Sequence, residues 1–202
     1  MKDDEAAVEP RTLVVEERDA HVVIRLNRPA ERNPLSVAVL AELEACVSAL
    51  VARPGISTII FTGTNDSFAS GANIRELGAL TPAAAREFAR RGQRLMQRIA
   101  DAPQLTIAAV NGYCMGGGLD LALSCRLRCS APSAVFAHPG ARLGIITGWG
   151  GTQRLPRLVG QARALEMFAT ARRLTSAEAF EMGLVNRVGD PVLECAFSLA
   201  RI

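Results

Sequence analysis

The sequence has few aromatic residues, little net charge and no long apolar run. Aromatic residues make up 4% of the 202 residues, and 23 basic against 20 acidic residues give a net charge of +3. No basic stripe alternates with stacking rings, so we expect no nucleic-acid partner. No segment stays apolar over the ~18 residues that a bilayer span needs, and the acidic N-terminus has no apolar signal segment. We therefore expect neither secretion nor a membrane partner.

The sequence contains few cysteines, and their spacing matches no common disulfide or metal-binding motif. The five cysteines form no C-x-x-C motif and lie mostly in apolar stretches, as reduced core cysteines do: Cys46, Cys114, Cys125, Cys129 and Cys195. This pattern predicts a reducing, cytoplasmic location. Neither a His/Cys/Asp cluster with metal-ligand spacing nor a G-x-x-x-x-G-K-[ST] motif is present, so we predict no metal site and no nucleoside triphosphate.

What the sequence does contain is enough apolar material for one globular domain, with 49% hydrophobic and 21% charged residues. Strands and helices alternate along it, which predicts an α/β domain with a mainly parallel sheet. The predicted strands are Thr12–Glu16, His21–Leu26, Ser57–Thr62, Thr106–Val110, Arg126–Ser130, Ala134–Ala137 and Leu184–Val188. The predicted helices are Val37–Leu50, Thr81–Ala102, Leu119–Leu123, Gln161–Ala171, Ser176–Met182 and one from about Pro191, with a Gly-rich loop from Gly144 to Gly151.

Arginines recur every four residues on one face of the predicted helix from Thr81 to Ala102, at Arg90, Arg94 and Arg98. A solvated helix face is the simplest interpretation, and anion binding is the alternative.

Two glycine-rich segments each follow a predicted buried strand and precede a helix. They are Ser70-Gly71-Ala72-Asn73 and Gly116-Gly117-Gly118. Glycine lets the backbone approach a ligand, and the first N–H groups of a helix have no partner within it. One amide from each segment could bind the same oxygen and form an oxyanion hole. The alternative is that these glycines only make tight turns.

Four ordered segments resemble the signature segments of the enoyl-CoA hydratase/isomerase (crotonase) family, and the resemblance covers residues 12–190. The segments are Asn27-Arg28-Pro29…Asn33, Phe68-Ala69-Ser70-Gly71-Ala72-Asn73-Ile74, Ala108-Ala109-Val110-Asn111-Gly112…Gly116-Gly117-Gly118 and Gly148-Trp149-Gly150-Gly151-Thr152-Gln153-Arg154-Leu155. The resemblance implies a spiral of ββα units that binds an acyl-CoA thioester as substrate, with no further cofactor.

The resemblance also assigns roles to residues. It implies that the amides of Ser70 and Gly117 hold the acyl carbonyl and that Asp120 handles a proton. The implied acyl-CoA path is lined by Ala30, Arg32, Ala72, Asn73, Ile74 and Gly116. Arg32 could equally be a plain surface charge.

The sequence departs from the family at both of its catalytic glutamates. Asp120 stands at the first position and Gly140 at the second. Hydration needs a group that activates water at the β-carbon and a group that delivers a proton to the α-carbon. Glycine at position 140 therefore removes one of the two carboxylates that the family uses for these steps. His138 could replace it as an acid or base, or be a buried, hydrogen-bonded structural histidine. Asp120 could also be only a favourable acidic residue in the first turn of a helix.

Gly140 and the turn at Gly148-Trp149-Gly150 also resemble the dihydroxynaphthoyl-CoA synthase branch, although Thr147 stands where that branch has a catalytic aspartate. Members of the family continue for about sixty residues past the last predicted helix here. We therefore expect a flexible tail at 1–11, a core domain at 12–190 and the start of a truncated C-terminal helical region at 191–202. The resemblance implies a homotrimer or hexamer.

Two rival functions come from other classes. Gly112-Tyr113-Cys114-Met115-Gly116 fits a nucleophile elbow, with Asp120 and His138 after it, but these intervals are too short for the crossovers of a hydrolase. A non-catalytic acyl-CoA-binding protein, or a decarboxylase- or synthase-like homologue, is favoured by Gly140. The leading prediction is hydration of a 2-enoyl-CoA.

Overall fold

The computed structural model describes residues 12–201, so the predicted tail at 1–11 lies outside the described residues. The strands are β1 Leu13–Arg18, β2 His21–Leu26, β3 Pro34–Leu35, β4 Thr58–Thr62, β5 Ser67–Ala69, β6 Gly71–Ala72, β7 Leu105–Val110, β8 Tyr113–Met115, β9 Leu127–Ser130, β10 Val135–Ala137, β11 Leu174–Thr175 and β12 Arg187–Val188. The helices are α1 Val37–Val51, α2 Ile74–Gly78, α3 Pro82–Ala100, α4 Gly117–Ser124, α5 Gly151–Val159, α6 Gln161–Thr170, α7 Ser176–Glu181 and α8 Val192–Ala200, with short 3-10 turns η1 Pro29–Glu31 and η2 Pro139–Leu143.

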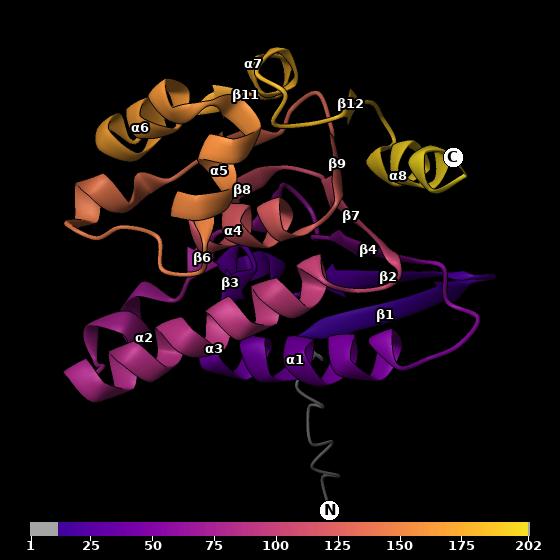
Figure 1. Ribbon diagram of the computed structural model, residues 1–202, viewed down its shortest axis with the longest axis horizontal. Helices are drawn as coiled ribbons and strands as arrows, with labels where there is room; N and C mark the ends of the chain where they lie inside the picture. Colours follow the sequence, from indigo (N-terminus) through magenta and orange to yellow (C-terminus); the bar gives the residue numbers. More distant parts are fainter. Residues whose placement is uncertain (1–11, 202) are drawn as a thin grey trace, which may run out of the picture.

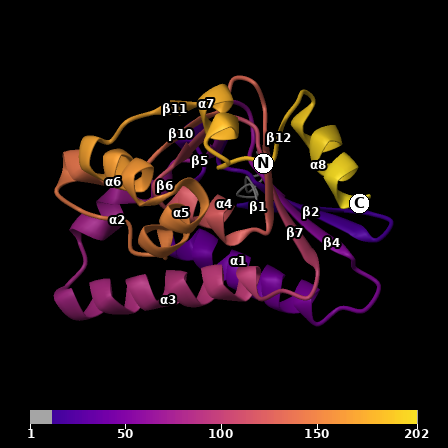
Figure 2. The same ribbon diagram turned by 45° about the horizontal axis from the view of Figure 1, so that its top comes forward.

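The main sheet has the strand order β1-β2-β4-β7-β9-β12, antiparallel between β1 and β2 and parallel elsewhere. Side chains alternate between the two faces of a strand, and both faces of the central strands are buried. In β4, Ile59 and Phe61 join the core cluster on one face, and Ile60 joins a second cluster with Phe197 of α8 on the other. Accordingly, α8 and the α1–α3 pair lie on opposite sides of this sheet (Figure 1, Figure 2).

A smaller sheet, β11-β10-β8-β5, positions the two glycine-rich segments. β5 and β8 are parallel, with Ala69 opposite Cys114. Parallel strands present their carboxyl ends at the same edge. The segment after Ala69 and the segment after Met115 therefore leave the sheet side by side, the first toward α2 and the second into α4.

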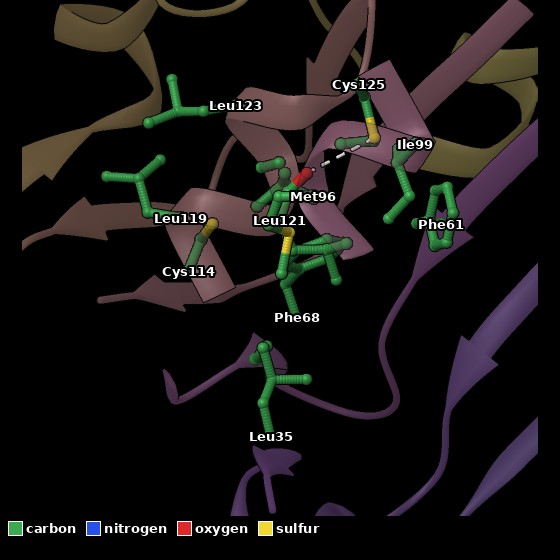
Figure 3. Close-up of a cluster of buried hydrophobic side chains, with 14 of the residues drawn as sticks. Leu35, Phe61, Phe68, Met96, Ile99, Cys114, Leu119, Leu121, Leu123 and Cys125 are labelled. Carbon is green, nitrogen blue, oxygen red and sulfur yellow. Dashed lines mark hydrogen bonds between the residues drawn. The ribbon is translucent and has the colours of Figure 1, made fainter. Parts of the chain in front are cut away.

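The helix α4 is buried on all sides. Every residue from Gly118 to Ser124 is buried, and Figure 3 shows Leu119 and Leu121 among core side chains that include Phe68 and Met96. An acidic side chain on this helix, such as Asp120, is therefore surrounded by protein rather than by water.

Most predicted elements are confirmed, and three differ. The helix α5 begins at the last residue of the predicted Gly-rich loop and was not predicted, because the glycines at its start and Pro156 inside it disguise its period. The strand predicted at Leu184–Val188 is reduced to β12. Short strands β5 and β8 separate each buried strand from its glycine-rich segment. Arg90, Arg94 and Arg98 are exposed, which confirms the solvated face.

Candidate active site

The two glycine-rich segments touch backbone to backbone. A Cβ added at Gly71 would lie 2.9 Å from the Met115 carbonyl oxygen and 3.2 Å from the Gly117 nitrogen. A Cβ added at Gly117 would lie 3.3 Å from the Ala72 nitrogen. Side chains at Gly71 and Gly117 would force the segments apart, so glycine at both positions is what allows the contact.

In the segment of residues 70–73, the backbone N–H groups of Ser70 and Ala72 have different surroundings. The Ser70 N–H donates to the Arg32 carbonyl at 3.0 Å and, less closely, to that of Asn33 at 3.4 Å. The Ser70 donor is therefore already occupied within the protein. The amide nitrogen of this segment that lies beside Gly117 is that of Ala72.

The other residues implied to line an acyl-CoA path fall into two groups. Ala30 and Arg32 are exposed on and just after η1, and the Arg32 guanidinium lies 5.3 Å from the centre of the Tyr113 ring. The Arg32 carbonyl accepts from Ser70, which brings this turn against the first segment. Asn73 instead caps α2 with its side-chain oxygen, and Ile74 begins that helix 61% exposed.

Gly116 supplies the turn into α4. It adopts φ +52°, a region that favours glycine, and its N–H donates to the Ala137 carbonyl at 2.9 Å. This turn places Gly117 at the first position of α4, where the helix provides no acceptor for its N–H. Asp120 lies in the same first turn, as predicted.

Asp120 is fully buried and asymmetrically hydrogen-bonded. Its Oδ2 accepts from the Thr147 hydroxyl and from the Trp149 N–H at 3.3 Å. Its Oδ1 has no hydrogen-bond partner among the described residues, and His138 Nε2 lies 3.7 Å away. Burial raises the pKa of Asp120 to about 6, although the bonds from Thr147 and Trp149, the charge of Arg154 and the backbone N–H of Gly151 act in the opposite direction.

His138 is 3% exposed and packs against Phe168, with 4.9 Å between ring centres. Neither of its ring nitrogens has a hydrogen-bond partner among the described residues. It is thus buried, but it lacks the hydrogen bonds of the structural histidine considered above. Burial lowers the pKa of His138 to about 4, so the ring is neutral near pH 7 and its contact with Asp120 is not an ion pair there.

Gly140 belongs to a tightly folded turn. The Ile145 N–H donates to the Gly140 carbonyl at 3.0 Å, and a Cβ added at Gly140 would lie 2.5 Å from the Ile145 carbonyl oxygen. The glycine therefore does more than omit a carboxylate: this turn has no room for any side chain at that position.

Trp149 closes one side of the site, although the sequence predicted no role for its side chain. It is 4% exposed. Added Cβ atoms at Gly92 of α3 and Gly117 of α4 would lie 2.2 Å and 2.4 Å from its indole ring. Gly92, on the buried face of α3, is the one sequence signal for this packing, because glycine inside a helix is unfavourable without a reason.

The hydrolase alternative does not fit this arrangement. Cys114 is fully buried in β8, and burial together with the charge of Asp120 raises the pKa of its thiol well above the usual range. A nucleophilic cysteine needs the opposite, an accessible and easily ionised thiol.

Comparison with known proteins decides the family. A family model described as enoyl-CoA hydratase/isomerase matches residues 16–200. The chain belongs to this family. The crotonyl-CoA hydratase of Syntrophomonas wolfei is 41% identical over 180 residues, which are 89% of this chain and 69% of that protein.

Solved structures agree with the family. An enoyl-CoA hydratase from Bacillus anthracis matches with a TM-score of 0.90 at 35% identity, over 95% of this chain and 76% of that one. DspI of Pseudomonas aeruginosa matches with a TM-score of 0.90 at 32% identity, over 98% and 82% of the two chains. These matches confirm the predicted α/β fold of the crotonase type.

Proposed function

We propose that the protein hydrates the double bond of a 2-enoyl-CoA thioester. One observation carries this proposal: the buried Asp120 carboxyl group lies in the first turn of α4, three residues after Gly117, whose amide adjoins Ala72. A relative named crotonyl-CoA hydratase supports this reaction and a short acyl chain.

In the proposed reaction, the amides of Ala72 and Gly117 donate to the thioester oxygen and stabilise the negative charge that develops there. Ala72 replaces Ser70 in this role because the Ser70 N–H already donates to Arg32. The thioester is the substrate, and no other cofactor is needed.

Asp120 then has to serve both proton transfers, since Gly140 carries no side chain. A water oxygen forms a bond to the β-carbon and gives one proton to the Asp120 carboxylate, while the electrons of the double bond move into the thioester enolate. Asp120 returns that proton to the α-carbon, which completes the addition of water and regenerates the carboxylate. A carboxyl group with a pKa of about 6 can both accept and release a proton near neutral pH.

The test is loss of the conjugated-thioester absorbance when crotonyl-CoA is added to the purified protein. Asp120→Asn keeps the size of the side chain but cannot accept the proton, so we expect a loss of roughly 10²–10⁴-fold in kcat. Asp66→Asn makes the same change at an exposed position and should leave the rate unchanged. Absence of turnover in the unmodified protein would exclude the hydratase proposal.

A second candidate is an acyl-CoA-binding protein without hydratase activity, or a homologue with another acyl-CoA reaction. The turn at Gly140, which has no space for a carboxylate, is the observation that favours it. Calorimetry with crotonyl-CoA and a saturated acyl-CoA separates the two. Tight binding of both without turnover would support this candidate.

We also propose a cytoplasmic homo-oligomer, a trimer or hexamer. The five cysteines are free thiols, which fits a reducing compartment. Ile146, Leu165 and Phe180 are each more than half exposed, and burial of such side chains between subunits would stabilise an oligomer. Among the described residues, no helix has the length and apolar character needed to cross a membrane.

A further inference from the structure

The least satisfied part of the buried interior is the space between Asp120 and His138. Asp120 Oδ1 and both ring nitrogens of His138 are buried without hydrogen-bond partners among the described residues. A buried polar atom without a hydrogen-bond partner loses its hydration without compensation and destabilises the folded protein. Three such atoms on two facing side chains are therefore unusual.

The geometry shows how two of these atoms, His138 Nε2 and Asp120 Oδ1, can satisfy each other. His138 Nε2 lies 3.7 Å from Asp120 Oδ1, and a shift of about half an ångström would bring it within hydrogen-bond range. Gly151 leaves this space open, because a Cβ at that position would lie 2.1 Å from Oδ1 and 3.1 Å from His138 Cε1. The Phe168 ring packs against the imidazole at a tilt of 40°.

We propose that His138 is a positioning residue for Asp120, with its Nε2–H donating to Oδ1 and holding the carboxylate in place for proton transfer. This inference rests on the proposed function, in which Asp120 is the base. Thr147 and Trp149 donate to Oδ2, and the backbone N–H of Gly151 also acts on this carboxyl group; the proposed bond from His138 adds a side-chain donor at Oδ1.

Two other titratable groups interact with Asp120. Arg154 of α5 lowers the pKa of its carboxyl group by charge. The Cys114 thiol of β8 is held in its neutral form by burial. Neither replaces a hydrogen-bond donor at Oδ1, so removal of His138 should leave that oxygen both unpaired and more poorly solvated. Each of these effects raises the pKa of Asp120.

The experiment measures the titration of Asp120 in two ways. One is the pH dependence of kcat/KM for crotonyl-CoA hydration. The other is the ¹³C NMR titration of the Asp120 carboxyl carbon without substrate, assigned with Asp120→Asn. In His138→Phe, which keeps an aromatic ring against Phe168, both midpoints should move up by about one unit, a roughly tenfold loss of kcat/KM on the acidic side.

Two variants serve as controls. His138→Gln retains an N–H donor and should shift the midpoint by less than His138→Phe does. His21→Phe makes the same substitution at the other histidine of the chain, on β2, where the ring packs against Phe197, and should shift nothing.

The outcomes separate this inference from the proposed function. Unchanged carboxyl titration in His138→Phe overturns the role of His138, whether or not the protein turns over crotonyl-CoA. A shifted titration in a protein that never hydrates crotonyl-CoA supports His138 as the partner of Asp120 and refutes the hydratase proposal. A shift in both readouts supports both.

Discussion

The helix α4 has a buried charged residue at each end, and the two are treated in opposite ways. Beyond its C-terminal end, the Arg128 guanidinium donates to the carbonyl groups of Leu184 at 2.8 Å, Cys125 at 2.6 Å and Ala122 at 3.4 Å. In its first turn, Asp120 leaves Oδ1 without a partner among the described residues. A cation that pairs with the last carbonyls of a helix stabilises the fold, whereas an unpaired carboxylate destabilises it.

This difference distinguishes a residue that stabilises the fold, Arg128, from a candidate catalytic residue, Asp120. Both side chains are at most 4% exposed, so burial alone does not distinguish them. Their hydrogen bonds do: the satisfied group belongs to the framework, and the unsatisfied one lies where a substrate or a proton could act on it. The following predictions test that distinction, beginning with the largest expected change in stability.

Arg128→Met should remove the hydrogen bonds that the guanidinium donates at the C-terminal end of α4. The Leu184 and Cys125 carbonyl groups lose the Arg128 donor, and the Ala122 carbonyl keeps only its bond from the Cys125 N–H, while the apolar volume is largely kept. We therefore expect the free energy of unfolding to fall by about 3–5 kcal/mol. Urea unfolding measures this. Arg126→Met is the matched control, because within residues 12–201 the exposed Arg126 guanidinium donates only to the Ala102 carbonyl, and its loss should cost about 1 kcal/mol. Equal losses in the two variants would contradict the framework role of Arg128.

The unsatisfied pair at the other end should appear in the pH dependence of stability. The pKa of Asp120 is about 6 in the folded protein against an ordinary 3.8, so its contribution to stability falls as pH rises from about 4 to 6. The pKa of His138 is about 4 against an ordinary 6.5, so its contribution is lost as pH falls through that window. Each effect amounts to about 3 kcal/mol, and the two oppose each other.

Variants should expose this cancellation. Relative to the unmodified protein, Asp120→Asn should lose about 3 kcal/mol of unfolding free energy as pH falls from 6.5 to 4, because only the histidine effect remains. His138→Phe should instead lose stability as pH rises from about 4 to about 7, because the variant is expected to raise the pKa of Asp120 by about one unit. Chemical denaturation across this pH range measures both curves. Curves that stay parallel to the unmodified protein would show that neither group titrates as burial predicts.

The framework was more predictable from the sequence than the site. The apolar period of Val37–Leu50 and the β-branched run of Ser57–Thr62 specify α1 and β4 locally, and the structure confirms both. The helix α5 was missed because its glycines and Pro156 are typical of a loop. Its position is fixed by contacts that a local pattern does not contain.

The site depends on such distant contacts. Resemblance located Asp120 and Gly117, but not the bond from Thr147, which lies 27 positions further along the chain. The use of the Ser70 amide by Arg32 is equally invisible in the sequence, because it depends on how η1 folds against β5. Partners of side chains and amides, rather than the residues themselves, were what the sequence could not supply.

The smallest predicted effect concerns Gly140, at the position where the family has its second glutamate. Its turn is closed by the bond from the Ile145 N–H, and an added Cβ would approach the Ile145 carbonyl to 2.5 Å. Gly140→Ala should therefore cost about 1–3 kcal/mol of unfolding free energy, the usual range for overpacking. Gly78→Ala in α2, where an added Cβ has nothing within 4 Å, should be neutral or stabilising by up to about 1 kcal/mol. If Gly140→Ala were as stable as Gly78→Ala, the turn could open at little cost. A glutamate at this position could then restore the second carboxylate, and Asp120 would no longer have to serve both proton transfers of the proposed hydration.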